Sequence, residues 1–512
     1  MLCPQYYCPR LSEFDLAVFG AIVPPDHYLR RAQQAIAWDE FYDILAPYYQ
    51  ADVGRPAESP VMILKLEYLR YHDNLSDRQV IARATTDVAY REFLQLGLQS
   101  LLPDPSSLCY FRGRLGADGF RQVFRQLIAQ AREQGLVKDR LRLKDASHVI
   151  AHIAVPNTLA LVAQIRDQLL TAAKPFDALR VEGERINIEQ LRETTAGQNH
   201  EQRLVARVTH LREILMWVDE LAPPAGADGN PAWQTLVLKR HLAHKILADR
   251  EHPKAGGRTL STVDPEARRG KHGGWYEGYV IDVMMDADSE LITELNLLSS
   301  SGEEADDAIT LIRQEEAAHG NDVKSLSIDG VGFNGPVLRE LEDPEGLAVD
   351  TIFPPRQEPA SETFTPEDFV SDPQTGRIHC PAGQTSSCRE RDERKHAWVH
   401  RFARKTCEAC PLLGRCMKNP PRGRYGKRIH KNDYEREFSR ARQKVATTGY
   451  QEVRAEHPKV ERKLGEILNR HGGRRAHYWG AGKVLIQELM AALATNVKRI
   501  VRLQCAPAAA PA

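Results

Sequence analysis

The order of strand-like and helix-like segments between residues 141 and 353 most constrains the fold of this chain. Residues 141–155 (LRLKDASHVIAHIAV) alternate and become β-branched, which is typical of a strand. Strand patterns return at residues 276–286 and 290–298, which can pair as a hairpin. Helix and strand patterns then alternate through 306–318 (helix), 323–328 (strand), 336–342 (helix) and 347–353 (strand). This order predicts a sheet with helices packed against its faces.

Helical patterns dominate the rest of the chain, whose 512 residues exceed what one compact core usually holds. Apolar residues at helical spacing occur in the N-terminal part at 28–49, 60–72, 76–98 and 119–134. They recur at 185–193, 199–221 and 233–249, and near the C-terminus at 433–447, 456–470 and 482–502.

We therefore predict a multidomain α and α/β protein. The predicted parts are a helical N-terminal domain (1–135), an RNase H-like mixed-sheet core (136–358) with a helical insertion at about 156–255, a cysteine-containing basic insert (359–430), C-terminal helices that complete the core (431–505) and a disordered tail (506–512).

Composition excludes several classes of protein. Hydrophobic residues make up 42% and charged residues 27% of the chain, which is typical of a soluble globular protein. No apolar run is long enough to span a membrane, and the first residues (MLCPQYYCPRLSEFD) lack the pattern of a secretory signal. We expect a cytoplasmic protein.

Charge is unevenly distributed although its total is balanced, with 69 Lys and Arg against 69 Asp and Glu. Residues 389–475 hold roughly twice as many basic as acidic side chains, while residues 300–368 are acidic. The basic stretch is the expected phosphate-facing surface.

Cysteines are also clustered. Nine in so long a chain are too few for a disulfide scaffold, and the clustering indicates metal. The expected ligands of one structural Zn²⁺ are Cys380, Cys407, Cys410 and Cys416, with Cys388 or His379 as substitutes. Reduced thiols without a metal remain the alternative. A site of four sulfur ligands has no open position, so it would stabilise the fold and take no part in catalysis.

Several motifs resemble those of the DDE transposases of bacterial insertion sequences, in the branch whose helical N-terminal domain precedes the catalytic core. The most extended is NLSDRQVIARATTDVAYREFLQLGL followed by LPDPSSLCYFRGRL. In the core the motifs are KDASHVIA, STVDPEAR with EGYVIDVMMD, SIDGVGFNG, HPKVERKLGEILNRHGGRRAHYWGAGKV and NVKRI. The family's inserts carry similar cysteines.

This resemblance implies a catalytic triad of Asp145, Asp329 and Glu461 holding two Mg²⁺ (or Mn²⁺) ions. Two divalent ions roughly 4 Å apart are what phosphodiester cleavage requires, and carboxylates suit them. Asp145 lies in the first predicted strand and Asp329 directly after a later one, at strand ends where ligands commonly bind. An Asp at a strand end is more often a turn former, and Glu456 competes with Glu461.

The sequence departs from the family pattern at two places. Ala146 and Ser147 stand where Gly and Thr usually follow the first aspartate. The basic residues nearest to Glu461, which are Lys463 and Arg470, are off the usual spacing.

The implied function is cleavage and strand transfer at the terminal inverted repeats of an insertion sequence, by a homodimer in a synaptic complex with double-stranded DNA, including target DNA. The alternatives are a catalytically inactive, domesticated DNA-binding protein and an RNase H-like nuclease without strand transfer. Arg112 and Arg114 are either solvated residues of a plain helical bundle or phosphate contacts. The candidate DNA contacts are Arg112, Arg114, Lys463, Arg470, Arg474 and Arg475.

Overall fold

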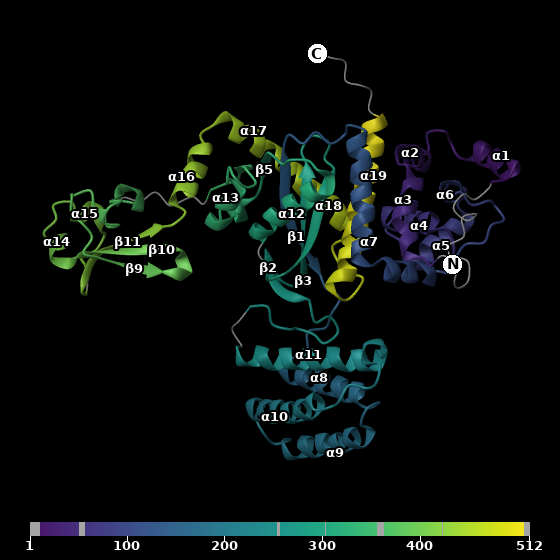
Figure 1. Ribbon diagram of the computed structural model, residues 1–512, viewed down its shortest axis with the longest axis horizontal. Helices are drawn as coiled ribbons and strands as arrows, with labels where there is room; N and C mark the ends of the chain where they lie inside the picture. Colours follow the sequence, from purple (N-terminus) through teal and green to yellow (C-terminus); the bar gives the residue numbers. More distant parts are fainter. Residues whose placement is uncertain are drawn as a thin grey trace, which may run out of the picture.

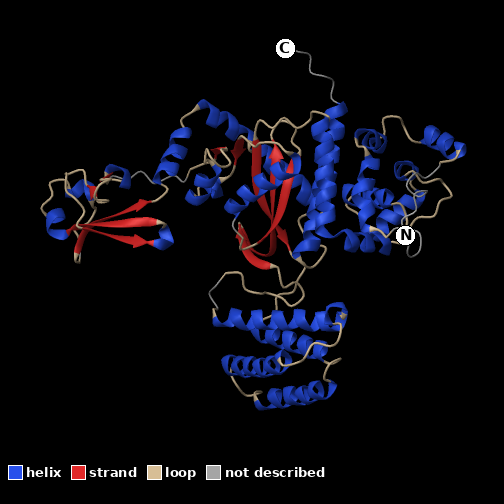
Figure 2. Cartoon of the chain, viewed as in Figure 1, coloured by secondary structure: helices blue, strands red, loops and turns tan. Residues whose placement is uncertain are grey.

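The computed structural model describes residues 11–50, 57–252, 256–302, 304–355, 363–421 and 423–505. The predicted tail at 506–512 lies outside these residues. The protein is a mixture of helix and sheet in several parts (Figures 1 and 2). No helix in the described ranges is long and apolar enough to cross a membrane.

A mixed sheet forms the centre of the molecule. Its first strand, β1 (Arg142–Ile150), pairs antiparallel with β3 (Gly274–Asp286) and parallel with β5 (Ser325–Ser327). The remaining strands are β4 (Ile292–Ser299) and β2 (Arg268–His272), both antiparallel to β3, and β6 (Asp350–Ile352), parallel to β5. Antiparallel strands thus lie on one side of β1 and parallel strands on the other, the mixed sheet that the order of patterns predicts.

Helices cover this sheet. They are α12 (Glu304–His319), α13 (Gly335–Leu341), α18 (Pro458–Arg470) and α19 (Ala481–Cys505). The long α19 packs beside α7 (Ser106–Glu133), between the sheet and the N-terminal helices (Figure 1). The sheet, α18, α19 and the N-terminal helices share one hydrophobic core, so the predicted N-terminal domain is not packed as a separate body.

In the N-terminal part the helix predicted at 60–72 has the expected bounds, whereas the helices predicted at 28–49 and 76–98 are each divided into shorter ones. The described helices before α7 are α1 (Glu13–Ile22), α2 (Tyr28–Ala35), α3 (Phe41–Leu45), α4 (Pro60–His72), α5 (Asp77–Thr86) and α6 (Val88–Leu94). The predicted helix at 76–98 is divided at Asp87, whose side chain accepts hydrogen bonds from the backbone of Ala89 and Tyr90 and so begins α6. In α7, Gly116 has a positive φ of 59° and kinks the helix.

The chain between β1 and β2 forms four helices, within the range where the sequence predicts a helical insertion. They are α8 (Thr158–Ala173), α9 (Ala178–Thr194), α10 (His200–Asp219) and α11 (Pro231–Glu251). These helices have a hydrophobic core of their own and lie together at one end of the central sheet (Figure 1).

The cysteine-rich segment folds into a small unit that we call the cysteine module, residues 363–432. Its three-stranded antiparallel sheet consists of β9 (Cys388–Asp392), β10 (Ala397–Ala403) and β11 (Tyr425–Asn432). The smaller elements are β7 (Val370–Ser371), β8 (Ile378–His379), α14 (Arg404–Glu408) and α15 (Leu413–Cys416). Helices α16 (Glu435–Lys444) and α17 (Thr448–Glu456) connect the module to α18.

Candidate active site

The pairing of β1 with β5 brings Asp145 and Asp329 to one part of the sheet. Arg142 lies opposite Leu326 and Leu143 opposite Ser327 in this parallel pair. Asp145 and Asp329 follow two residues further along the respective segments, so the same register directs them to neighbouring positions. Asp145 is half-buried within β1, and Asp329 begins the turn after β5, where its carboxylate accepts a hydrogen bond of 3.1 Å from the amide of Val331.

Glu461 lies in the first turn of α18, which begins at Pro458. Proline is favoured at the start of a helix because its missing N–H is not needed there. Helix α18 packs against β1 through an apolar face that includes Val460, Leu464 and Ile467. Glu461 itself is exposed.

The three acids share one electrostatic environment. Burial, and after it the negative charges of Asp329 and Glu461, raise the pKa of Asp145 to about 6. The hydrogen bond from the amide of Ala146, 2.9 Å long, opposes the shift because it favours the charged form. Asp329 and Glu461 therefore both lie near enough to Asp145 to act on the pKa of its carboxyl.

A fourth acid, Glu304, lies beside this group and was not predicted from the sequence. It begins α12, and burial together with the charge of Asp329 raises its pKa. Lys144, the neighbour of Asp145, donates a hydrogen bond of 2.9 Å to the backbone carbonyl of Glu304. The sequence does not distinguish Glu304 from its acidic neighbours in residues 303–307. What sets Glu304 apart is its place at the start of α12, which only the structure gives.

The acids do not form a closed cage. Within the described ranges, no three Cys, His, Asp or Glu side chains are placed to hold a metal ion as they stand. Magnesium sites characteristically combine one or two carboxylates with waters and substrate phosphates, so an open group of acids has the donors that such an ion uses.

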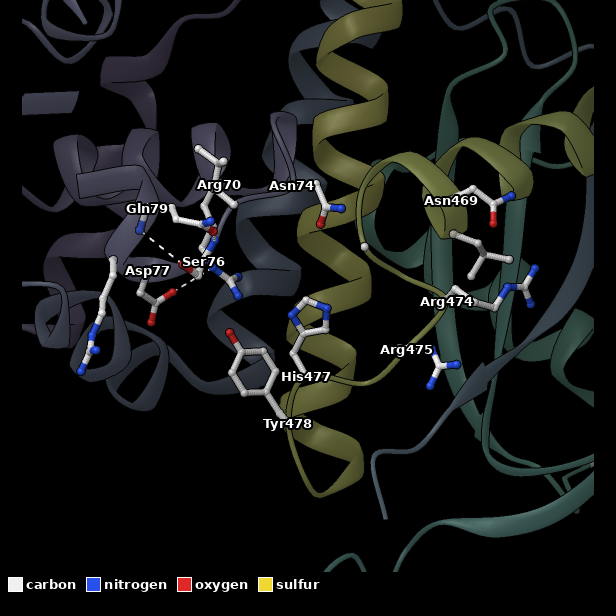
Figure 3. Close-up of a pocket in the computed structure, with 14 residues that line it drawn as sticks. Arg70, Asn74, Ser76, Asp77, Gln79, Asn469, Arg474, Arg475, His477 and Tyr478 are labelled. Atoms are coloured by element: carbon white, nitrogen blue, oxygen red, sulfur yellow. Dashed lines mark hydrogen bonds and ion pairs between the residues drawn. The ribbon is translucent and has the colours of Figure 1, made fainter. Parts of the chain in front are cut away.

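A groove lined by residues of α5, of α18 and of the segment after α18 has a volume of about 840 Å³ (Figure 3). In Figure 3, Asn469, Arg474 and Arg475 stand on one side, Ser76, Asp77 and Gln79 on the other, and His477 and Tyr478 between them. None of the predicted acids lines this groove. Arg474, which does, donates a hydrogen bond of 2.8 Å to the carbonyl of His148 and contacts Ser147 Oγ at 3.4 Å, so the groove reaches the strand that carries Asp145.

The predicted DNA contacts fall into two groups. Arg112 is only 8% exposed and pairs with Glu67 and Asp77, while Lys463 is 5% exposed and lies 3.4 Å from Glu466. Their burial and their acidic partners make them structural residues, contrary to the expectation that they face DNA.

The other four predicted contacts are accessible. Arg114, Arg470 and Arg475 are exposed, and Arg474 is half-buried at the edge of the groove. Arg114 lies 4.2 Å from the centre of the Tyr49 ring. Two arginines in the groove, Arg78 and Arg475, are exposed and form no ion pair within the described ranges, and Arg78 lies near enough to Asp104 to help lower the pKa of that carboxyl.

The four predicted cysteine ligands come together in the cysteine module. Cys380, Cys407, Cys410 and Cys416 line a cavity of about 30 Å³. Burial raises the pKa of Cys416, and the other three thiols raise it further. The amide of Lys427 donates a 3.4 Å hydrogen bond to Cys407 Sγ. Cys388 instead interacts with Arg401, so it is not part of this group.

Comparison with known proteins identifies the class of the chain. Residues 17–114 match the family described as Transposase domain (DUF772), and residues 379–501 match the family described as Transposase DDE domain. Both matches support a DDE transposase of an insertion-sequence family. Of the three acids, Glu461 lies within the second match, whereas Asp145 and Asp329 lie outside both.

A curated relative gives no further functional information. The protein "Uncharacterized protein ORF8 in nfe locus" of Rhizobium meliloti is 28% identical over 120 residues, which cover 23% of this chain and 58% of that protein. The chain thus spans little more than half the length of this relative. No solved structure matches the chain.

Proposed function

We propose that this protein cuts and joins DNA at the ends of an insertion sequence, with Asp145, Asp329 and Glu461 as its catalytic acids. The observation that carries the proposal is the grouping of three carboxyls from β1, the end of β5 and α18, with the pKa of Asp145 raised to about 6 by burial and by the other two charges. A concentration of negative charge that is not neutralised favours bound cations. The mixed sheet with helices on its faces supports an RNase H-like core.

Two Mg²⁺ or Mn²⁺ ions held by these acids would activate the attacking oxygen and stabilise the leaving oxygen of the phosphodiester. A carboxyl group binds a metal ion only when it is deprotonated. Asp145 must therefore lose its proton, which the raised pKa of this carboxyl makes harder. In the nicking step a water oxygen bonds to phosphorus while the bond to the 3′ oxygen breaks, and that oxygen leaves with a proton as a hydroxyl. In the joining step this hydroxyl oxygen attacks a phosphorus atom of the target DNA, releasing another 3′ hydroxyl.

The groove that reaches β1 through Arg474 is the proposed path of the substrate strand. Arg78 comes from α5 and Arg475 from the segment between α18 and α19, so a phosphate backbone in the groove would be contacted from two sides. Arg474 would keep the strand close to Asp145 through its position beside Ser147. Pairing of two DNA ends requires two active sites, which favours a homodimer as the working unit.

One structural Zn²⁺ in the cysteine module is part of the proposal. Four thiols around a cavity of about 30 Å³, together with an amide directed at one sulfur, supply the ligand types of a tetrahedral Zn²⁺ site, and the thiols would have to move closer together to hold the ion. Such an ion would stabilise the module and would not react with DNA, because four sulfur ligands leave no open coordination position.

The decisive test is nicking of a DNA fragment that carries the element's own end, in the presence of Mg²⁺. Asp329→Asn should abolish nicking while leaving DNA binding largely intact. Asp322→Asn is the matched control, because Asp322 is an exposed acid upstream of β5 that pairs with Lys324. Wild-type protein that binds the end but never nicks it would favour a domesticated DNA-binding protein. Nicking without joining would favour a plain nuclease.

A further inference from the structure

Residues 388–432, which comprise the three-stranded sheet of the cysteine module and the segments that connect its strands, are strongly basic. Residues 388–432 contain fourteen Lys and Arg but four Asp and Glu, an excess of ten positive charges in a protein whose total charge is zero. The remaining residues therefore carry an equal excess of negative charge. Such segregation is not needed for solubility and is typical of a surface that meets a polyanion.

Several of these cations are free to bind a ligand. Arg394 and Lys395 lie in the turn between β9 and β10, and Lys405 and Lys418 lie near the cysteines. All four side chains are exposed, and none has an acidic partner or a hydrogen bond within the described part of the chain. Exposed cations without partners are available for phosphate groups.

The aromatic rings of the sheet indicate which form of nucleic acid fits. Trp398 is covered by two guanidinium groups, those of Arg389 and Arg391, whose centres lie 4.6 Å and 5.5 Å from the ring. Tyr425 is covered in the same way, by Arg401 at 5.2 Å and Arg424 at 5.4 Å. Proteins that bind single strands use open aromatic rings on which bases stack. In this module arginine side chains cover the rings of Trp398 and Tyr425, so these rings are not open for bases to stack on.

We propose that residues 388–432 bind the phosphate backbone of duplex DNA without sequence preference. This inference rests on the proposed function in one respect only, namely that the partner is DNA. Figure 1 shows the module and the N-terminal helices on opposite sides of the central sheet. The module therefore binds DNA at a place remote from the groove. It binds transposon and target duplexes alike, because contacts to the DNA backbone carry no sequence information.

The test measures DNA binding by the full chain carrying Asp329→Asn, so that cleavage does not interfere. Two double variants remove module cations: Arg394→Ala with Lys395→Ala, and Lys405→Ala with Lys418→Ala. Lys174→Ala with Arg185→Ala is the matched control, because these exposed cations of the helical insertion also lack acidic partners within the described residues. Fluorescence anisotropy gives Kd for an end duplex, an unrelated duplex and a single strand over a range of salt concentrations.

Each module variant should raise Kd about five- to tenfold for both duplexes and make the slope of log Kd against log salt shallower by about two. The control should leave both quantities unchanged. Equal Kd and slope for the parent and both module variants would overturn the proposal, as would a loss confined to the end duplex or to the single strand. A chain that never nicks DNA, but whose module variants bind duplexes more weakly, would refute the proposed function and support this inference.

Discussion

Arg454 donates a hydrogen bond of 2.9 Å to the backbone carbonyl of Ile328, the residue that directly precedes Asp329. The same guanidinium contacts Ser327 Oγ at 3.2 Å, and the ring of His457 contacts this hydroxyl at 3.1 Å. Burial, together with the charge of Arg454, lowers the pKa of His457 to about 4, so this ring is neutral at physiological pH. The end of β5 is thus tied to α17 and to the start of α18, the helix that carries Glu461.

Arg454 is therefore a positioning residue for the proposed catalytic acids. Arg454→Ala should lower kcat for nicking about tenfold to a hundredfold, because small displacements of reacting groups are costly. The Kd for the DNA end should change little. Arg454→Lys should recover part of kcat, because an ammonium group can still donate to the carbonyl of Ile328. Equal losses in kcat and in DNA binding, or no recovery with Lys, would contradict a positioning role.

Glu304 is the second position to test, because the charge of Asp329 raises its pKa. Glu304→Gln removes one negative charge from the group and should raise the Mg²⁺ concentration for half-maximal nicking by about tenfold. Asp306→Asn, an exposed acid in the same helical turn, is the control and should leave the Mg²⁺ dependence unchanged. An unaltered Mg²⁺ dependence in Glu304→Gln would remove Glu304 from the site.

The central sheet could be predicted because its strands are apolar and alternate. The predicted strand at 276–286 corresponds to β3 at Gly274–Asp286, and that at 290–298 corresponds to β4 at Ile292–Ser299. Strand β2 was missed because its sequence, RRGKH, is polar. It forms by pairing with the first residues of β3, a contact that local patterns do not encode. The strands of the cysteine module were missed because they contain Arg, His and Cys in place of β-branched residues.

The sequence predicted Asp145 within a strand and Asp329 directly after one, and in the structure the charges of Asp329 and Glu461 act on Asp145. The sequence could not separate free cations from buried ones, because ion pairing depends on distant segments. Arg112, for example, pairs with Glu67, which lies 45 residues away in α4. The groove was also beyond prediction, because α5 and the segment after α18 meet only in the folded chain.

The proposed zinc site depends on a close approach between Gly426 and Cys407. A Cβ atom at position 426 would lie 2.5 Å from Cys407 Sγ, which is too close for both atoms to stay in place. Gly426→Ala should therefore displace Cys407 and lower the zinc content of the purified protein, measured by atomic absorption. Gly414→Ala in α15 is the control, because a Cβ there meets nothing within 4 Å. Absence of zinc from the wild-type protein would refute the site, and full zinc content in Gly426→Ala would refute the steric argument.

Glu488 on α19 makes stability depend on pH. It is fully buried, and burial raises the pKa of its carboxyl well above the usual range. Its Oε2 atom has no hydrogen-bond partner within the described residues, and Gln487 donates a 3.3 Å hydrogen bond to Oε1. The folded protein therefore keeps the proton that the unfolded chain releases above its ordinary pKa. The free energy of unfolding accordingly falls as pH rises from about 4.5 toward the raised folded pKa.

Glu488→Gln replaces this acid with a neutral group of the same shape, so it should remove the penalty. Its Tm should exceed that of the wild type by several degrees at about pH 8 and by much less at about pH 5, because folding at the higher pH no longer requires uptake of a proton. Scanning calorimetry at both pH values provides the measurement. Glu452→Gln, at an exposed position of α17, is the control and should show no such difference. A larger gain at about pH 5 than at about pH 8 would mean that Glu488 is charged in the folded protein.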